Sequence, residues 1–138
     1  MVIEEVKKSE LEQVFLLLRQ HWTLDNYSLF YHSYYRIKEN QSKIYVVKDK
    51  DKIVGCCMLH LQYKFIRNGS KAGFIEEVIV DSQNRKKGIG EKLIKFVIKE
   101  AKRLGCYKIT LSCFDELVSF YTKCGFFREN NTMRYNIK

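Results

Sequence analysis

Two adjacent carboxylates and a basic glycine loop stand close together in the stretch EEVIVDSQNRKKGIGEKLIKF, residues 76–96. A carboxylate such as Glu76 or Glu77 is a candidate for accepting a proton from a reacting group. The loop, residues 85–90, precedes a helical pattern, and the N–H groups at a helix start attract anions. Each feature is common alone. Their succession favours one ligand that explains both, and a pyrophosphate group fits the loop best.

The loop has the spacing R-x-x-G-x-G, with cations at Arg85, Lys86 and Lys87 and glycines at 88 and 90. Glycine removes the side chain, so a phosphate can approach the backbone closely. The phosphate loop GxxxxGK[ST] and the dinucleotide motif GxGxxG are both missing from the sequence. A plain flexible loop is the alternative on this pattern alone.

The elements that must position these residues follow from the spacing of apolar residues. Residues 89–104 form the clearest helix, because apolar side chains recur at helical spacing and Gly105 ends the pattern. A capping box of Ser9 and Glu12 predicts a helix through Leu18. We expect further helices over 25–38 and 115–123, and strands over 2–6, 43–48, 53–63, 73–80 and 106–113, with two last strands on either side of Asn130-Asn131.

This order predicts an α/β fold with a central mixed, mostly antiparallel sheet flanked by about four helices. The strand, helix and strand from residue 73 to residue 113 predict a parallel crossover. The 138 residues suit one domain, 1–138, because no linker, repeat or low-complexity tract divides them.

The composition narrows the choice of partners. Lysine and arginine number 25 against 16 acidic residues, a net charge of +9, which attracts polyanions or reflects a solvated lysine-rich surface. A nucleic-acid-binding module would need cations interleaved with exposed aromatic residues in a recognised motif, and the sequence contains none. Every apolar run is shorter than the roughly 18 residues of a membrane span. We therefore expect neither a nucleic acid nor a membrane as partner.

The cysteines and the start of the chain bear on the compartment. The five cysteines form no CxxC pair and no zinc spacing, so we interpret them as small buried apolar groups in a reducing environment. The start, MVIEEVKKSELEQ, does not look like a signal peptide. These features predict a cytoplasmic protein without a disulfide framework or a metal site.

The strand, the R-x-x-G-x-G loop, the helix and the later FYTKCGF together resemble the GNAT superfamily of N-acetyltransferases. Within it, the segments YKFI, IEEVIV, GCYKITL and VSFYTKCGF are similar to signatures of enzymes that acetylate glucosamine 6-phosphate. The resemblance is tight over 63–126 and looser outside. It implies acetyl-CoA as cosubstrate, direct attack of the sugar amine on the thioester, and a place in UDP-N-acetylglucosamine synthesis.

The resemblance also implies roles for single residues. An attacking amine must lose a proton, and the departing thiolate must gain one. Glu76 then orients the amine or accepts its proton, directly or through water, and Tyr121 faces the coenzyme sulfur. A phenol with a pKa of about 10 can protonate a thiolate whose conjugate acid has a pKa of about 8.5. The implied coenzyme contacts are Val78, Ile79, Val80, Arg85, Lys86, Lys87, Gly88, Ile89, Gly90, Glu91 and Tyr121.

The substrate side is implied in the same way. Glu77 stands where the family typically has an aspartate. Successive strand residues point to opposite faces, so a cleft that holds both Glu76 and Glu77 requires a bulge in the strand. The implied substrate contacts are Thr23, Lys64, Phe65, Ile66, Arg67, Glu76, Glu77, Val78, Tyr107, Lys108, Ser112 and Arg134.

Three positions depart from the family pattern. Ser112, which we place among the catalytic residues, replaces an acidic residue whose main-chain carbonyl helps to hold the amine, and a serine keeps that carbonyl. Leu117 replaces an asparagine associated with the coenzyme. Strict spacing puts Asn136 where the family carries a phosphate-binding arginine, and we expect Arg134, on the same strand face, to substitute for it.

The sequence contains three histidines. His21, His32 and His60 show no ligand spacing, so we expect each to be a structural or surface residue. Another small amine is the alternative acceptor. A coenzyme A-binding protein without catalysis is a third possibility, which the presence of Glu76 and Tyr121 disfavours.

The final segment, TMRYNIK, has one apolar and one polar face. Such a strand would be an adhesive edge on a monomer. The resemblance implies a homodimer whose C-terminal strands pack together, with Lys108 or Arg134 reaching into the neighbouring site. The alternating residues are Met133, Tyr135 and Ile137 on one face and Arg134, Asn136 and Lys138 on the other.

Overall fold

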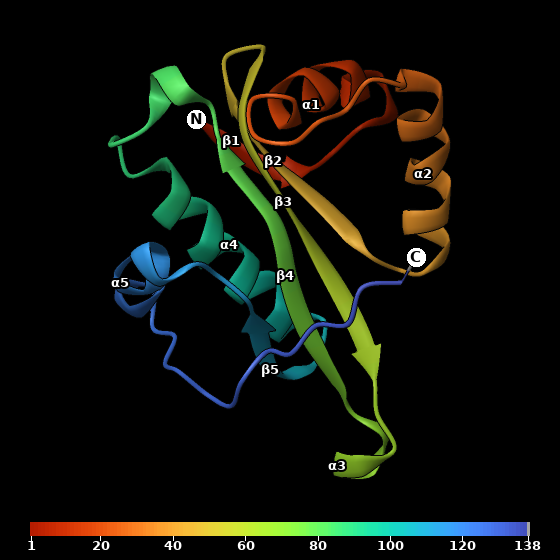
Figure 1. The fold of residues 1–138 in the computed structure, drawn as a ribbon, viewed down its shortest axis with the longest axis vertical. Coiled ribbons are helices and arrows are strands. Elements are labelled where there is room, and N and C mark those ends of the chain that lie inside the picture. The colour runs from red at the N-terminus through yellow and green to blue at the C-terminus, as the bar shows by residue number, and fades with distance from the viewer. Residues whose placement is uncertain (138) are drawn as a thin grey trace.

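A computed structural model describes residues 1–137 and shows one five-stranded sheet (Figure 1). The strands follow each other across the sheet in chain order; the first four pair antiparallel, and the last two pair parallel. The mixed, mostly antiparallel sheet is therefore confirmed. Its strands are β1 (Val2–Glu5), β2 (Lys43–Asp49), β3 (Lys52–Tyr63), β4 (Lys71–Val80) and β5 (Cys106–Leu111).

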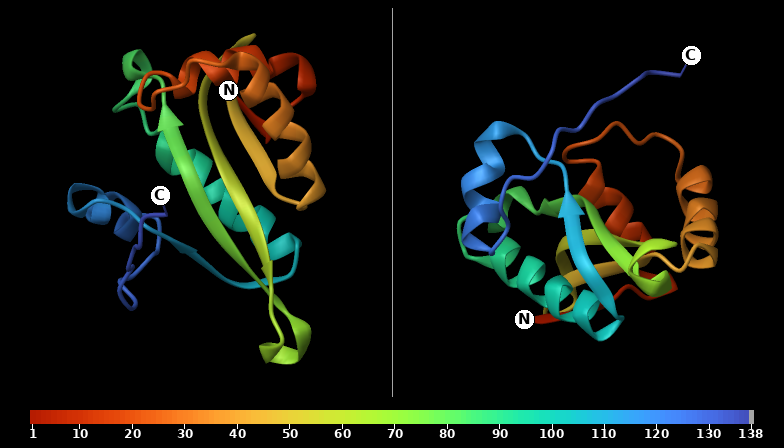
Figure 2. Two further views of the ribbon diagram at one scale, coloured as in Figure 1. Left: turned by 45° about the vertical axis from the view of Figure 1, so that its right-hand side comes forward. Right: turned by 90° about the horizontal axis from the view of Figure 1, so that it is seen from below.

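Helices cover both faces of the sheet (Figures 1 and 2). On one face lie α1 (Leu11–Leu18) and α2 (Tyr27–Glu39), and on the other lies α4 (Ile89–Arg103). The short α3 (Ile66–Gly69) forms the tip of the β3–β4 hairpin, and α5 (Val118–Lys123) follows β5. Because α4 connects β4 to a parallel neighbour, the predicted crossover is confirmed.

The period-2 alternation of β3 separates two apolar cores. Cys57 and Leu59 face α4, where they pack with Leu93, Ile94 and other residues of its apolar stripe. Met58, one position along, instead packs under α1 and α2. Since both faces of β3 are buried, its sequence reads as a nearly continuous apolar run.

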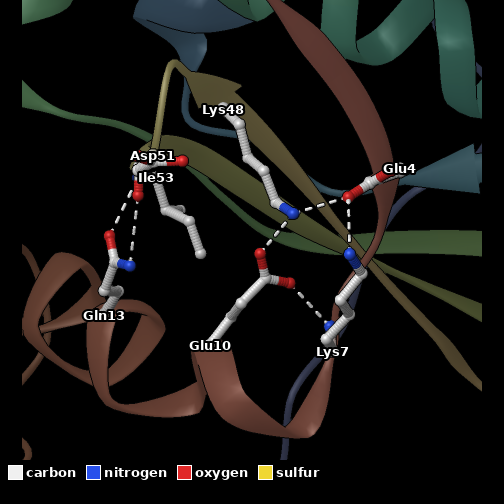
Figure 3. A network of polar contacts seen from close by, with 7 residues as sticks. All are labelled: Glu4, Lys7, Glu10, Gln13, Lys48, Asp51 and Ile53. Carbon is white, nitrogen blue, oxygen red and sulfur yellow. Dashed lines mark hydrogen bonds and ion pairs between the residues drawn. The ribbon is translucent and has the colours of Figure 1, made fainter.

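Polar contacts hold the turn before α1 against β1 and β2, and Gln13 of α1 against the start of β3 (Figure 3). Lys48 of β2 pairs with Glu4 at 2.5 Å and also with Glu10. The predicted capping box of Ser9 and Glu12 is wrong. The helix is entered through a 3-10 turn, and the Lys7 N–H donates to the Glu10 carboxylate at 2.7 Å, so the cap lies two residues earlier.

The two strands predicted after residue 125 are also wrong for the isolated chain, because residues 126–137 form neither helix nor strand. The tail runs free of the sheet in both views of Figure 2, and Met133 and Tyr135 are 92% and 87% exposed. A strand requires a neighbour to satisfy its N–H and C=O groups, and this tail has none within residues 1–137. Lys138, the last residue of the predicted pattern, lies outside the described residues.

Candidate active site

A bulge in β4 brings the two glutamates together. The register runs from Cys56–Ile79 to Met58–Glu76, so one residue of β3 faces two of β4. Glu77 has a φ of +53°, the left-handed conformation that relieves strict alternation. The bulge that the sequence required is present, and both carboxylates line the same two cavities.

The larger cavity, about 1670 Å³, opens where β4 and β5 separate. Their pairing ends at Ile75 and Leu111, although β4 continues to Val80. The backbone of residues 76–80 therefore has no strand partner on this edge, and its amides are available to an extended ligand. Val78, Ile79 and Val80, which we predict to contact the coenzyme, line the groove.

One end of the groove leads to the glycine loop and the start of α4. Gly88 is the N-cap with a φ of +76°, and a side chain added there would meet nothing within 4 Å. The first intrahelical bond runs from Lys92 N–H to Gly88 O at 3.1 Å, so the preceding N–H groups point outward without helix partners. These groups, the helix dipole and the open glycine suit a pyrophosphate.

The other predicted loop residues act differently from one another. The Arg85 side chain lines the groove and donates to Val80 O at 3.2 Å, while Ile89 is buried and offers only its backbone. At Gly90 a Cβ would lie 3.1 Å from the ring of Phe120. Gly90 therefore also permits α4 to pack against α5.

The sequence did not reveal a set of hydrogen bonds that anchors the start of this loop. Asp81, 5% exposed, accepts from the Gln20 amide at 2.7 Å and from the Asn84 amide at 2.6 Å. Gln20 also accepts from the Ser82 N–H at 3.0 Å, which ties the loop to the end of α1. These hydrogen bonds lower the pKa of Asp81 and keep it ionised.

Tyr121 of α5 lies in the wall of the groove. Only 8% of it is exposed, and burial raises its pKa to about 12, with Cys113, Cys57 and Cys124 adding to the effect. The phenol thus stays protonated at neutral pH, ready to donate to a ligand atom in the groove.

A smaller cavity of about 550 Å³ lies on the opposite side of the glutamates, between the sheet and α1 and α2. Thr23 lies in its wall, as predicted for a substrate contact, and so does Trp22, which lines both cavities. Most of the wall is apolar. Its ionisable side chains are Asp25, Tyr34, Cys56, His60, Glu76 and Glu77, and within residues 1–137 it contains neither lysine nor arginine.

His60, which we expected to be a structural or surface residue, lies beside Glu76. Its Nε2 lies 2.5 Å from Glu76 Oε1, and its Nδ1 lies 2.7 Å from the hydroxyl of Ser42. The pKa of the neighbouring Glu77 is raised, chiefly by burial and then by Glu76, while His60 lowers it. The sequence contains no signal for this contact, because it depends on the strand register, which pairs Met58 with Glu76 and so makes His60 a diagonal neighbour of Glu76.

The remaining predicted substrate residues fall into two groups: Tyr107, Lys108 and Arg134 line the larger cavity, whereas residues 64–67 do not. Residues 64–67 occupy the far tip of the hairpin, outside both cavities, with Phe65 fully exposed (Figure 1). Arg67 stacks on Tyr107 at 5.0 Å, and Lys108 approaches the same ring at 5.7 Å. Arg134 lies in the tail, where it donates to Asn136 at 2.7 Å.

Ser112 lies at the end of β5, on the wall of the groove. Its hydroxyl is 3.1 Å from the Thr132 hydroxyl, which holds the tail near the site. In residues 1–137 the structure contains no cluster of three or more metal-ligating side chains and no helix long and apolar enough to cross a membrane.

The splayed strands, the anion-binding helix start and the paired carboxylates define an acyltransferase of the GNAT type. The acetyltransferase (GNAT) family model matches residues 8–126. The chain belongs to this family.

Several relatives of this chain are glucosamine 6-phosphate N-acetyltransferases. Glucosamine 6-phosphate N-acetyltransferase 1 of Oryza sativa subsp. japonica is 40% identical over 73 residues, which are 53% of this chain and 44% of that protein. Glucosamine 6-phosphate N-acetyltransferase of Arabidopsis thaliana is 45% identical over 74 residues, 54% of this chain and 50% of that protein. The chain thus spans about half the length of these curated relatives.

The fold extends the likeness to the whole chain. The crystal structure of the Arabidopsis thaliana glucosamine-6-phosphate N-acetyltransferase superposes with a TM-score of 0.89 at 30% identity. The superposition covers 99% of this chain and 98% of that one.

Proposed function

We propose that this chain, a single domain over residues 1–138, transfers the acetyl group of acetyl-CoA to the amine of D-glucosamine 6-phosphate. The products are N-acetyl-D-glucosamine 6-phosphate and CoA. The observation that carries the proposal is the bulge at Glu76 and Glu77, which lies between a groove suited to the coenzyme and a cavity suited to an amine.

The coenzyme side fits acetyl-CoA through backbone groups. The outward N–H groups at the start of α4 would hold the pyrophosphate, with Arg85, Lys86 and Lys87 adding charge. The free edge of β4 past Ile75 would pair with the amides of the pantetheine arm. This arrangement directs the thioester toward the bulge.

The chemistry requires two proton movements. Glu76 accepts a proton from the substrate ammonium, and the freed nitrogen attacks the thioester carbon. As the C–N bond forms and the C–S bond breaks, the thiolate leaves and Tyr121 donates a proton to it. The amide nitrogen loses its second proton to solvent, Glu76 returns its proton to solvent, and Tyr121 is reprotonated from solvent, so the transfer releases one proton overall. The main-chain carbonyl of Ser112 helps to orient the nitrogen.

The phosphate of the substrate requires cations, which the smaller cavity lacks. We propose that a homodimer supplies them, with Arg134 or Lys108 of one chain completing the site of the other. The exposed apolar residues Met133, Tyr135 and Ile137 support this pairing, since a free tail with one apolar face is a poor surface for a monomer. A sedimentation mass of one chain would contradict it.

The test of the activity is thiol release from acetyl-CoA with a panel of amines, followed by mass analysis of the product. We expect glucosamine 6-phosphate to be acetylated at least about tenfold more efficiently than glucosamine, because the phosphate adds charge-assisted contacts. Equal rates with both sugars would contradict the assignment of the substrate, though not of the reaction.

A second candidate acceptor is a small primary amine with an apolar body. The observation in its favour is the smaller cavity, whose walls are apolar and whose charged groups near Glu76 are carboxylates. Preferential acetylation of such an amine in the same panel would establish it. We place either activity in the cytoplasm, and the first in the synthesis of UDP-N-acetylglucosamine.

A further inference from the structure

Three side chains form a hydrogen-bonded row across neighbouring parts of the sheet. Ser42 precedes β2, His60 lies on β3 and Glu76 lies on β4. The Ser42 hydroxyl is 2.7 Å from His60 Nδ1, and His60 Nε2 is 2.5 Å from Glu76 Oε1. Exposure rises along the row: Ser42 is buried, the His60 side chain is 27% exposed and that of Glu76 is 45% exposed. The row thus leads from the protein interior to the reacting end of the cleft.

The backbone fixes both ends of this row. The register pairs Lys43 with Leu59, so the preceding Ser42 falls opposite His60. Ser42 is anchored further by its own N–H, which donates to Ile37 O at 3.1 Å. At the other end, the bulge holds Glu76 opposite Met58. His60 therefore bridges two fixed points, and its ring has little freedom to turn.

We propose that His60, held by Ser42, is a positioning residue that orients the Glu76 carboxylate and sets the acid limit of acetyl transfer. The proposal rests on the proposed function of Glu76. In neutral His60, the Ser42 hydroxyl donates to Nδ1, and the Nε2–H donates to Glu76. This tautomer leaves the second oxygen of the carboxylate free for the substrate ammonium.

Protonation of His60 keeps the geometry and changes the charge. Nδ1–H then donates to the Ser42 oxygen, since a hydroxyl can accept as well as donate. The imidazolium then pairs with Glu76 and repels an incoming ammonium group. Acetyl transfer should therefore fall when His60 becomes charged.

The other ionisable groups in the wall of the smaller cavity are neutral or acidic, so His60 determines whether a positive charge is present there. Glu77 of β4, Asp25 of the loop after α1 and Tyr34 of α2 face the same space. Lys43, the first residue of β2, does not line this cavity, and its Nζ lies 3.9 Å from Glu5 Oε1. Among residues 1–137, His60 is the one side chain in the cavity wall that can carry a positive charge.

Two substitutions of His60 separate its role as a hydrogen-bond donor from its ability to carry a charge. His60→Gln places an amide near the position of Nε2 and keeps a donor for Glu76 that cannot be charged. His60→Asn reaches only the position of Nδ1 and loses that donor. We expect His60→Asn to lower kcat about tenfold at pH 8, the typical loss for one hydrogen bond to a charged group. His60→Gln stays within about threefold of wild type and loses the fall in kcat/KM toward pH 6. The surface substitution His32→Gln is the control and changes neither quantity.

A double substitution distinguishes positioning from a structural role. In a Glu76→Gln background, His60→Asn should add no further loss, because its effect passes through the carboxylate. Losses that multiply, or a His60→Gln enzyme that keeps the wild-type fall in kcat/KM toward pH 6, would overturn the proposal.

The imidazole nitrogen chemical shifts of the ligand-free protein give a readout independent of any substrate. They should report the Nε2–H tautomer and change with Glu76→Gln. If the enzyme acetylates no amine, the proposed function fails; unchanged shifts mean that the row itself is absent.

Discussion

The coenzyme side and the acceptor side of Glu76 differ in how much of each a single chain supplies. The coenzyme side is built from backbone groups of one continuous segment, β4, the loop and α4, with the buried Tyr121 beside it. The predicted acceptor residues instead come from separate parts of the chain: residues 64–67 lie on the exposed hairpin tip, Arg134 on the tail, and Lys108 on β5. A site made of consecutive backbone is complete when its segment folds, whereas a site made of distant side chains requires further packing.

The largest expected effect falls at the junction of the two sides. Glu76→Gln removes the proton acceptor, so kcat should fall roughly 10²–10⁴-fold while coenzyme affinity stays unchanged. Stopped-flow thiol release and calorimetric titration with CoA measure the two quantities. Glu116→Gln, on the exposed turn before α5, is the matched control. If coenzyme affinity fell by the same factor as kcat, Glu76 would belong to the coenzyme site, and the contrast between the coenzyme side and the acceptor side would be contradicted.

On the coenzyme side, Tyr121→Phe should slow the chemical step about 10²-fold, because only the departing thiolate requires the hydroxyl. Coenzyme affinity should be retained, since the ring keeps its packing against Phe120 and Phe126. Single-turnover kinetics isolate this step. A loss smaller than about threefold, with chemistry rate-limiting, would make Tyr121 a packing residue and leave protonation to water.

On the acceptor side, Arg134→Ala should raise KM for glucosamine 6-phosphate about tenfold and leave KM for glucosamine unchanged. The sharper form is complementation: inactive Glu76→Gln and strongly impaired Arg134→Glu chains are mixed and allowed to exchange. Some heterodimers then contain one intact site, and activity returns. Absence of recovery after proven exchange would place the acceptor site within one chain.

The glycine loop gives a smaller effect. Gly88→Ala forces a side chain into the left-handed conformation, at about 1–2 kcal/mol, and should raise KM for acetyl-CoA several-fold. Gly105→Ala imposes the same strain beyond the other end of α4, where φ is +88°, and should lower stability without touching KM. Equal kinetic effects of both substitutions would show that the loop does not bind the coenzyme.

The smallest effect concerns stability at the bulge. Burial and Glu76 raise the pKa of Glu77 above its ordinary value of 4.5, so the native state holds that proton more tightly than the unfolded chain. Its contribution favours folding at low pH and is lost as the pH rises through the raised value. Glu77→Gln should therefore raise Tm at pH 7 relative to wild type, and the advantage should vanish below pH 4.5. An advantage that persists in acid would assign the effect to packing.

The same contrast explains what the sequence could predict. The loop, α4 and the order of β1 to β5 follow from local periodicity, and the sequence predicted them closely. The bulge was predicted as a requirement of Glu76 and Glu77. Contacts that depend on register, such as His60 with Glu76, leave no local signal. The tail was predicted as strand because its alternation is real, but a strand also needs a neighbour, and residues 1–137 of one chain supply none.

A crystal structure of the protein with CoA and N-acetylglucosamine 6-phosphate bound together tests the central claim most directly. We predict the pyrophosphate on the N–H groups at the start of α4, the sulfur beside the Tyr121 hydroxyl and the sugar nitrogen beside Glu76. The sugar phosphate should contact cations of a second copy. A complex in which one chain alone binds the phosphate, or in which the sugar nitrogen lies away from Glu76, would contradict this account.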